Sequence, residues 1–408
     1  MWIAVSRLHA TGRRWSQQYG PAIVSLSFLL LTLGLIYWRV IRGYTPPVSF
    51  AQWPEPPNWV QSLYTLRWFV RGLQVVAGLM LIYIEWASRA LSSWLNSVLG
   101  DRLTGFTFIS IIGFLLGSYL IQPGHLASGD ASPHIAGGWA VLESIKDGQW
   151  FVYWSNYGYF GHPFLQFYSV IYYYLVALTS LVARDFYQAN DFVLVLLHTL
   201  SAYPMYLYVQ QVTKSRVGGL VAAIAWSGTF YRYHLIVVLG KLTTAPFIAL
   251  WPLQFYFAEK LYQDESPRYR WWGGPALTVG AMLWTHKLYG LWAIVMGLVY
   301  TGTQIIIRRS QGSNTRILVR LAMSISAYVM GAFIGFYEII PSYIEQSLTL
   351  LGARNADHFN LPAIFLQNVL VFEGSYLTDW FGGYIGNTIV ACAMLVVILA
   401  VVVRYVPV

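Results

Sequence analysis

The sequence predicts an all-α, polytopic integral membrane protein with about eleven transmembrane helices. Of its 408 residues, 57% are hydrophobic and only 10% are charged, whereas about 25% are charged in a soluble domain. Uncharged stretches long enough for a helix to cross the hydrocarbon, roughly 20 residues, recur along the whole chain. A barrel would show strands of alternating polarity, and the stretch VIYYYLVALTSLVA at 170–183 does not alternate.

The eleven candidate helices are separated by polar or Pro-rich connections. They lie at 22–38, 66–85, 106–122, 163–183, 191–211, 217–236, 242–258, 273–285, 288–307, 321–340 and 383–403. Three longer stretches, 43–62, 123–162 and 341–382, do not have the composition of a membrane helix. The first candidate helix follows Arg7, Arg13 and Arg14 and lacks a small-residue cleavage site, so we expect it to be retained rather than removed as a signal peptide.

The basic residues, which give a formal charge of +9, occur in short clusters between apolar stretches. This pattern favours a role in orientation and in binding anionic head groups, and no nucleic acid partner is expected. The single cysteine, Cys392, lies in an apolar stretch, which excludes a disulfide framework and a cysteine metal site.

Lys and Arg in short loops predict which end of each helix faces the cytoplasm. The cytoplasmic clusters would be Lys214 with Arg216, Lys260 with Arg268 and Arg270, and Arg308, Arg309, Arg316 and Arg320. Segments 232–241, 285–287 and 341–382 would then be outside, and so would 123–162 if the N-terminus is inside. Two full crossings at 163–183 and 191–211 would break this scheme, so we expect 163–183 to be re-entrant or interfacial. The alternative is an outside N-terminus, with 123–162 in the cytoplasm.

The stretch SGDASPHIAGGW, residues 128–139, places Asp130 and His134 four residues apart just after a membrane helix. Ser132 and Pro133 are typical of an N-cap and a first helical position. Ile135, Trp139, Leu142 and Ile145 then form one apolar face at helical spacing, which predicts an amphipathic helix in the membrane interface. Asp130 is either a capping residue of a solvated loop or a functional carboxylate favoured by the helix dipole.

Residues 129–174 resemble the first outer loop of GT-C glycosyltransferases, most of all the bacterial membrane proteins described as pyruvoyl-tetrahydropterin synthase-related. The pattern is an acidic residue and a His, an amphipathic helix, and then YGYFGHPFLQFYSVIYYYL. Three further landmarks follow in the expected order: LGKLTTAPFIALWPL at 239–253, THKLYGL at 285–291 and YEIIPSYIEQSL at 337–348. Val170 replaces a usual Pro, and Lys241 and Thr244 stand where Arg and Glu are common.

The resemblance implies a GT-C-like membrane core at 106–350 with an outer loop at 123–162. Residues 1–105 would be additional N-terminal membrane helices, and 351–408 an outer loop with the last helix. The implied activity is transfer of a sugar from a polyprenyl phosphate to an acceptor on the outer face of a bacterial inner membrane. Asp130 would be the catalytic base. The residues expected to bind the lipid phosphate or the acceptor are His134, Arg232, His234, Lys241, His286, Lys287 and Glu338.

Each of these residues also has a structural interpretation. His286 and Lys287 would mark an interfacial turn, Lys241 and Arg232 would anchor head groups, and the tyrosines at 168 and 172–174 would form packing and an aromatic belt. The sequence identifies no cofactor with certainty, and His125, His134 and Asp130 are candidate ligands for a divalent metal. The alternative function is that of a non-catalytic transmembrane subunit, bound to protein partners in a larger complex. No inverted repeat indicates a secondary transporter.

Overall fold

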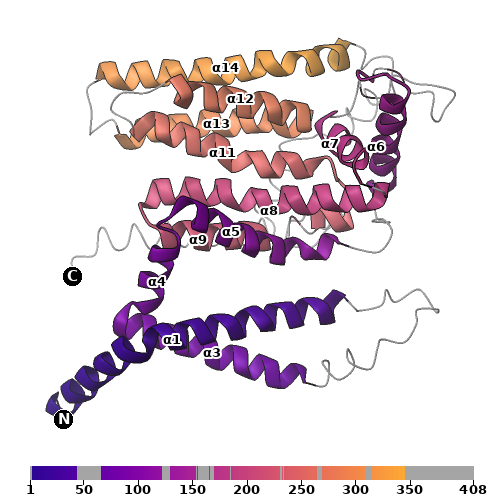
Figure 1. Ribbon diagram of the computed structural model, residues 1–408. Coiled ribbons are helices and arrows are strands. Elements are labelled where there is room, and N and C mark those ends of the chain that lie inside the picture. Colours follow the sequence, from indigo (N-terminus) through magenta and orange to yellow (C-terminus); the bar gives the residue numbers. More distant parts are fainter. Residues whose placement is uncertain are drawn as a thin grey trace, which may run out of the picture.

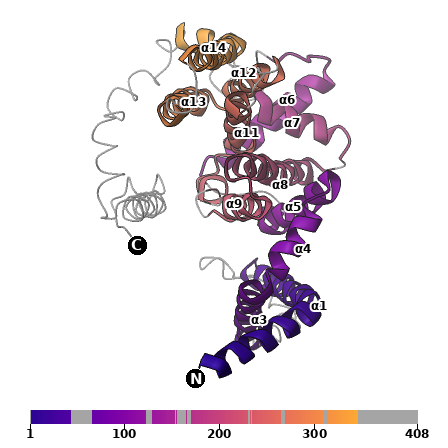
Figure 2. The ribbon, with the colours of Figure 1, turned by 90° about the vertical axis from the view of Figure 1, so that its left-hand side faces the viewer.

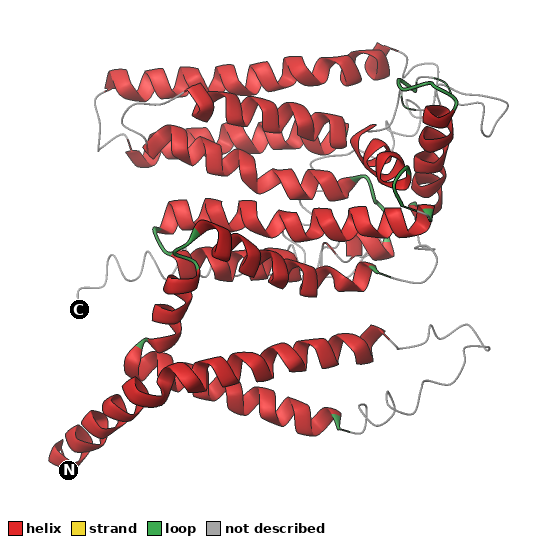
Figure 3. Cartoon of the chain, in the orientation of Figure 1, coloured by secondary structure: helices red, strands yellow, loops and turns green. Residues whose placement is uncertain are grey.

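The computed structural model of the chain describes residues 2–43, 66–121, 129–152, 154, 165, 170–183, 185–229, 232, 234–263, 269–308 and 314–344. Within these ranges every regular element is a helix and no strand occurs (Figure 3). The predicted helix at 383–403, His125, and the part of the 341–382 loop that follows residue 344 lie outside the described residues.

In the part of the chain that the structure describes, four helices are long and apolar enough to cross a membrane: Trp68–Ser88, Phe186–Thr213, Lys287–Ile305 and Leu318–Tyr337. A fifth crossing is obtained if α4 (Ala90–Val98) and α5 (Arg102–Gly117), which meet at an angle of 109°, form one broken span. The prediction of about eleven crossings is not confirmed. One of the predicted stretches forms a helix shorter than the roughly 20 residues that span the hydrocarbon, with 13 residues in α9.

The main part of the molecule is a bundle of long helices that run side by side (Figure 1, Figure 2). It contains α5, α8 (Phe186–Thr213), α9 (Arg216–Gly228), α11 (Thr244–Gln263), α12 (Tyr269–Thr285), α13 (Lys287–Arg308) and α14 (Asn314–Ile344). The helices α1 (Trp2–Gly43) and α3 (Arg67–Ser88) pair with each other and join the bundle through α4. This pair corresponds to the additional N-terminal helices of the sequence prediction.

Two further helices, α6 (Ala131–Lys146) and α7 (Val170–Ser180), lie at one end of the bundle and run across the direction of its helices (Figure 1). Both are held by the largest hydrophobic core, to which α6 contributes Val141, α7 contributes Tyr172 and α8 contributes Leu194. Most of 163–169, which precede α7, lie outside the described residues. The expectation that 163–183 does not fully cross therefore stays a prediction.

The basic clusters and the first large loop lie at opposite ends of the bundle. Lys214 hydrogen-bonds Gln263 at the end of α11, and Arg320 donates to the carbonyl of Tyr262 at 2.7 Å. The start of α6 instead contacts the loop that leads into α11, through a hydrogen bond from the Asp130 amide to the Leu239 carbonyl at 2.9 Å. Because α11 has 20 residues, these ends are separated by about 30 Å, as the charge pattern predicts.

This arrangement predicts the result of single-cysteine labelling in a Cys392→Ala background. Thr104→Cys, in the exposed first turn of α5, should react with a membrane-impermeant maleimide only from the face that carries the basic clusters. Ser132→Cys, exposed in α6, should react only from the opposite face. The Cys392→Ala protein is the unlabelled control, and labelling of both positions from one side would contradict the arrangement.

Candidate functional site

The start of α6 differs in detail from the prediction. The helix begins at Ala131 with Asp130 at the N-cap position, so Ser132 and Pro133 lie inside its first turn. The Asp130 amide donates to the carbonyl of Leu239, and the helix starts earlier than its sequence signal indicates. The Asp130 side chain is exposed and accepts no capping hydrogen bond. Asp130 therefore occupies the cap position without using its carboxylate as a cap.

The predicted apolar face of α6 is only partly correct. Ile135, Leu142 and Ile145 are buried, but Trp139 is 41% exposed and lies on another side of the helix. Gly138 lies against α7 and α8, where an added Cβ would be 3.4 Å from Phe186 and 3.5 Å from Val176. Much of α6 is thus covered by protein, because a small residue at Gly138 allows α7 and α8 to approach the helix.

Two glycines shape the contact between the α6 loop and the loop before α11. Gly129 has φ of +43° and Gly240 has φ of +68°, in the left-handed region that favours glycine. A Cβ on Gly129 would lie 2.1 Å from the carbonyl oxygen of Leu239, so the two backbones approach too closely for any other residue. The segment just before Lys241 includes a π-helix, His234–Val238, a conformation that is frequent at functional sites. The contact brings Asp130 beside Lys241.

Gly129→Ala tests this contact. The added methyl group clashes with backbone rather than with a movable side chain, and the residue must also keep a positive φ. We expect a loss of about 1–3 kcal/mol in the free energy of unfolding, measured by thermal unfolding in nanodiscs. Gly148→Ala is the matched control, since Gly148 also has a positive φ but has open space around its Cβ position. An equal loss in both variants would show that φ alone, and not the contact, matters.

Four residues predicted for the site, Asp130, His134, Lys241 and His286, are close enough to influence one another electrostatically. Burial lowers the pKa of His134 to about 4; the Asp130 carboxylate opposes this and the Lys241 ammonium adds to it. Burial also lowers the pKa of His286 to about 4, followed by the charges of Lys241 and His134. Both histidines lie outside the four candidate spans. At neutral pH both imidazoles of the cluster are therefore neutral.

Aromatic residues hold the two histidines in place. Nδ1 of His134 is 2.9 Å from the hydroxyl of Tyr173, which is buried on α7. The His286 ring stacks on Tyr289, with 4.1 Å between the ring centroids, and Tyr289 contacts Phe247 of α11. Tyr173 belongs to the tyrosine stripe that sequence reasoning assigned to packing, so its hydrogen bond to the site was missed. Lys287, adjacent to His286, is partly buried at the start of α13.

Arg232 has a different environment from the one expected. It is buried, donates to the hydroxyl of Ser201 at 2.7 Å and to the carbonyl of Trp226 at 3.2 Å, and lies over the Trp226 ring. A head-group anchor would be exposed, so that interpretation is wrong, and Arg232 instead links α8 to α9. His234 lies in the π-helix and Glu338 in α14, and the side chains of both are outside the described part of the structure.

The sequence analysis did not identify two buried carboxylates, Glu259 and Asp191. Glu259, near the other end of α11, accepts hydrogen bonds from Tyr300 and from Gln263, each at 2.5 Å. Asp191 is buried near the start of α8. Both carboxylates adjoin an apolar stretch, and a carboxylate near hydrocarbon is costly unless it has a partner or a function. That position is the signal by which they could have been found.

The candidate metal set of Asp130, His125 and His134 is not placed as a whole, because His125 lies outside the described residues. Among the residues that are described, no group of three His, Cys, Asp or Glu side chains is arranged to hold a metal ion.

No protein-family model, curated protein or solved structure matches the chain. The geometry of the site is therefore the basis of the function proposed below.

The lowered histidine pKa values predict that stability falls in acid. An unfolded histidine has a pKa near 6.5, above the folded value of about 4 for His134 and for His286. Stability present above about pH 6.5 is therefore lost as the pH falls toward 4, by roughly 2 kcal/mol for His134 at pH 5. Thermal unfolding of the protein in nanodiscs between about pH 7.5 and 5 measures this. The double variant His134→Gln, His286→Gln should show a flatter profile, and an unchanged slope would contradict the assignment.

Proposed function

We propose that the chain is a GT-C-type membrane glycosyltransferase, which moves a sugar from a polyprenyl phosphate to an acceptor on the outer face of a bacterial inner membrane. The observation that carries this proposal is the cluster of Asp130, His134, Lys241 and His286. These residues come from three distant parts of the chain and meet at the end of the bundle opposite the basic clusters. This end is where α6 and α7 lie across the long helices (Figure 1).

The charged groups of the cluster match the two requirements of a sugar transfer, which are removal of the acceptor proton and stabilisation of the departing lipid phosphate. An acceptor hydroxyl needs a carboxylate within hydrogen-bond reach to take its proton, and Asp130 is exposed at the edge of the cluster. The departing lipid phosphate gains negative charge and needs a cation and hydrogen-bond donors. Lys241 supplies the cation, and neutral His286 has one ring N–H to donate. Partial burial strengthens these interactions relative to bulk water.

His134 is a positioning residue in this scheme. Its side chain is buried, interacts electrostatically with both Asp130 and Lys241, and lies with Nδ1 2.9 Å from the hydroxyl of Tyr173. In its neutral form it adds no charge of its own next to the proposed base and the proposed cation.

Binding of the donor lipid provides a direct test. The purified protein in nanodiscs should bind a polyprenyl phosphate at least about tenfold more tightly than the polyprenol with the same tail, because only the former carries the anion that Lys241 attracts. In cells, removal of the chain should eliminate one surface glycan and cause the polyprenyl-phosphate sugar to accumulate. Equal binding of the two lipids together with an unchanged glycan profile would refute the proposal, and the non-catalytic subunit would then be the better interpretation.

A further inference from the structure

The segment 232–241 connects the buried part of the bundle to the candidate site. It follows α9 and contains the π-helix His234–Val238. At its far end the Lys241 amide donates to a carbonyl of the π-helix at 3.0 Å, and the Leu239 carbonyl accepts the amide of Asp130 at 2.9 Å. The positions of Lys241 and of the loop before α6 therefore depend on how this segment is held.

Arg232, at the start of this segment, is held by contacts with α8 and α9. Its side chain is only 3% exposed and donates to the hydroxyl of Ser201 at 2.7 Å and to the carbonyl of Trp226 at 3.2 Å. It also lies 5.5 Å from the centroid of the Trp226 ring. A guanidinium is ionised in proteins, and in some proteins a buried charged group fixes one specific arrangement rather than adding stability.

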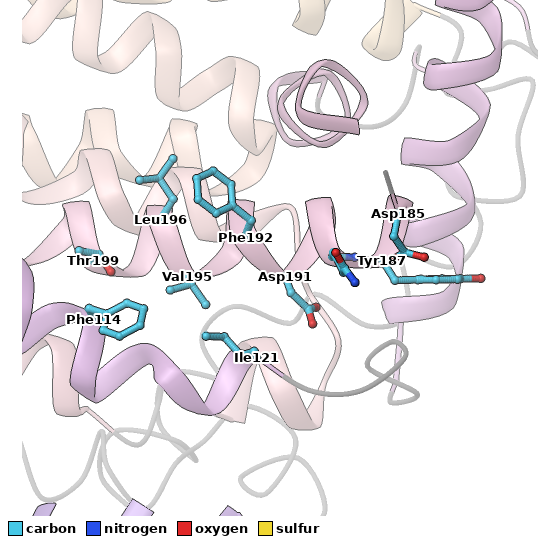
Figure 4. Close-up of a pocket in the computed structure, with 10 residues that line it drawn as sticks. Phe114, Ile121, Asp185, Tyr187, Asp191, Phe192, Val195, Leu196 and Thr199 are labelled. Carbon is cyan, nitrogen blue, oxygen red and sulfur yellow. Dashed lines mark hydrogen bonds between the residues drawn. The ribbon is translucent and has the colours of Figure 1, made fainter. Parts of the chain in front are cut away.

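The part of α8 that carries Ser201 is itself packed closely against α5. A Cβ on Gly113 would lie 2.9 Å from the carbonyl oxygen of Thr199, so the two helices touch with no side chain between them at this point. Figure 4 shows Thr199 of α8 and Phe114 of α5 at one end of the recess that these helices line. Arg232 is therefore tied to a well-packed part of the bundle.

A row of aromatic rings also connects Arg232 to the site. The Trp226 ring contacts Trp251 of α11 with 6.0 Å between the ring centroids, and Trp251 contacts Phe247 at 5.6 Å. Phe247 in turn contacts the tyrosine on which His286 stacks. Chains of packed side chains of this kind carry energetic coupling between distant parts of a protein. Arg232 is thus linked to the cluster both through the backbone of 232–241 and through these rings.

We propose that Arg232 is a positioning residue, which fixes the segment 232–241 and thereby places the Lys241 ammonium beside Asp130 and the two histidines of the cluster. Arg232 does not touch a substrate and acts through Lys241. This inference rests on the proposed function in that Lys241 is taken to bind the lipid phosphate, but the placement of Lys241 is measurable without turnover.

Titration of His134 and His286 by NMR tests this placement. Besides burial, the charges that lower their pKa values are those of Lys241 and, for His286, of His134. We expect Arg232→Gln to raise both pKa values by roughly one pH unit, because Lys241 is no longer held near the two rings. A purely structural role would lower the unfolding temperature without changing either pKa, and that result would overturn the proposal.

A second variant leaves the charge of Arg232 intact and carries the test if Arg232→Gln does not fold. Ser201→Ala removes one hydrogen bond of the guanidinium, and both histidine pKa values should rise by a smaller amount. Unchanged pKa values in folded Ser201→Ala would also overturn the proposal. Arg216→Gln is the matched control and should change neither pKa, since Arg216 donates to the carbonyl of Asn96 at 3.0 Å from the other end of α9.

Lipid binding in nanodiscs separates this inference from the proposed function. Arg232→Gln should bind polyprenyl phosphate about tenfold more weakly than the wild type and polyprenol equally well. If the wild type does not prefer polyprenyl phosphate, the proposed function fails, whereas raised histidine pKa values in both variants still support the positioning role. A clear preference in the wild type together with unchanged pKa values in the variants would retain the proposed function and overturn the role of Arg232.

Discussion

Asp130→Asn is expected to reduce sugar transfer by about 10²- to 10⁴-fold, the usual contribution of a general base. The amide keeps the size of the side chain but cannot accept the proton of the acceptor hydroxyl. Folding should be preserved, because the Asp130 carboxylate makes no capping hydrogen bond and Asn is an equally good N-cap residue. The measurement is loss of the modified glycan in cells that express the variant at the wild-type level.

The control for this experiment is Asp147→Asn, which changes the same residue type at the other end of α6. Asp147 is exposed and lies at the C-cap, so its substitution should leave transfer unchanged. Normal glycan in Asp130→Asn cells would show that the carboxylate is not the base. The cluster would then be better explained as part of a subunit that retains the scaffold without the chemistry.

Lys241→Gln should have the second-largest effect, a reduction in transfer on the order of 10²-fold. The variant removes the cation that would face the lipid phosphate but keeps a side chain that can donate hydrogen bonds. Binding of polyprenyl phosphate should weaken, whereas binding of the uncharged polyprenol should not change. Lys146→Gln is the control, because Lys146 is paired with Glu143 at 2.8 Å on the exposed side of α6.

The same variant gives a readout that does not require turnover. The Lys241 ammonium lowers the pKa of both His134 and His286, so both pKa values should rise when it is removed. Histidine titration by NMR, with side-chain ¹⁵N labels, measures this shift. Unchanged titration of both histidines in Lys241→Gln would mean that Lys241 is not part of the cluster, whatever its effect on transfer.

Asp130, Lys241 and His286 show which parts of the candidate site could be predicted from the sequence. Each was chosen because the resemblance to GT-C glycosyltransferases implies a base and phosphate-binding residues on the outer side of the membrane. The structure places the three near one another. Arg232 was chosen in the same way and is buried between α8 and α9 instead. The pattern identifies charged residues near the ends of apolar stretches, but it does not distinguish a partner in the protein from a ligand.

The sequence alone determined that the protein is helical and membrane-embedded, because composition and the length of apolar stretches follow directly from the cost of exposing backbone to lipid. The basic clusters left two placements open for the loop with Asp130, and the structure decided that it lies at the end of the bundle opposite Lys214 and Arg320. Only the tertiary structure decided where α6 begins and which of its faces is buried. These features depend on the 2.1 Å approach that requires glycine at position 129 and on the packing of α7 and α8. Such contacts join residues far apart in the chain, and no local pattern encodes them.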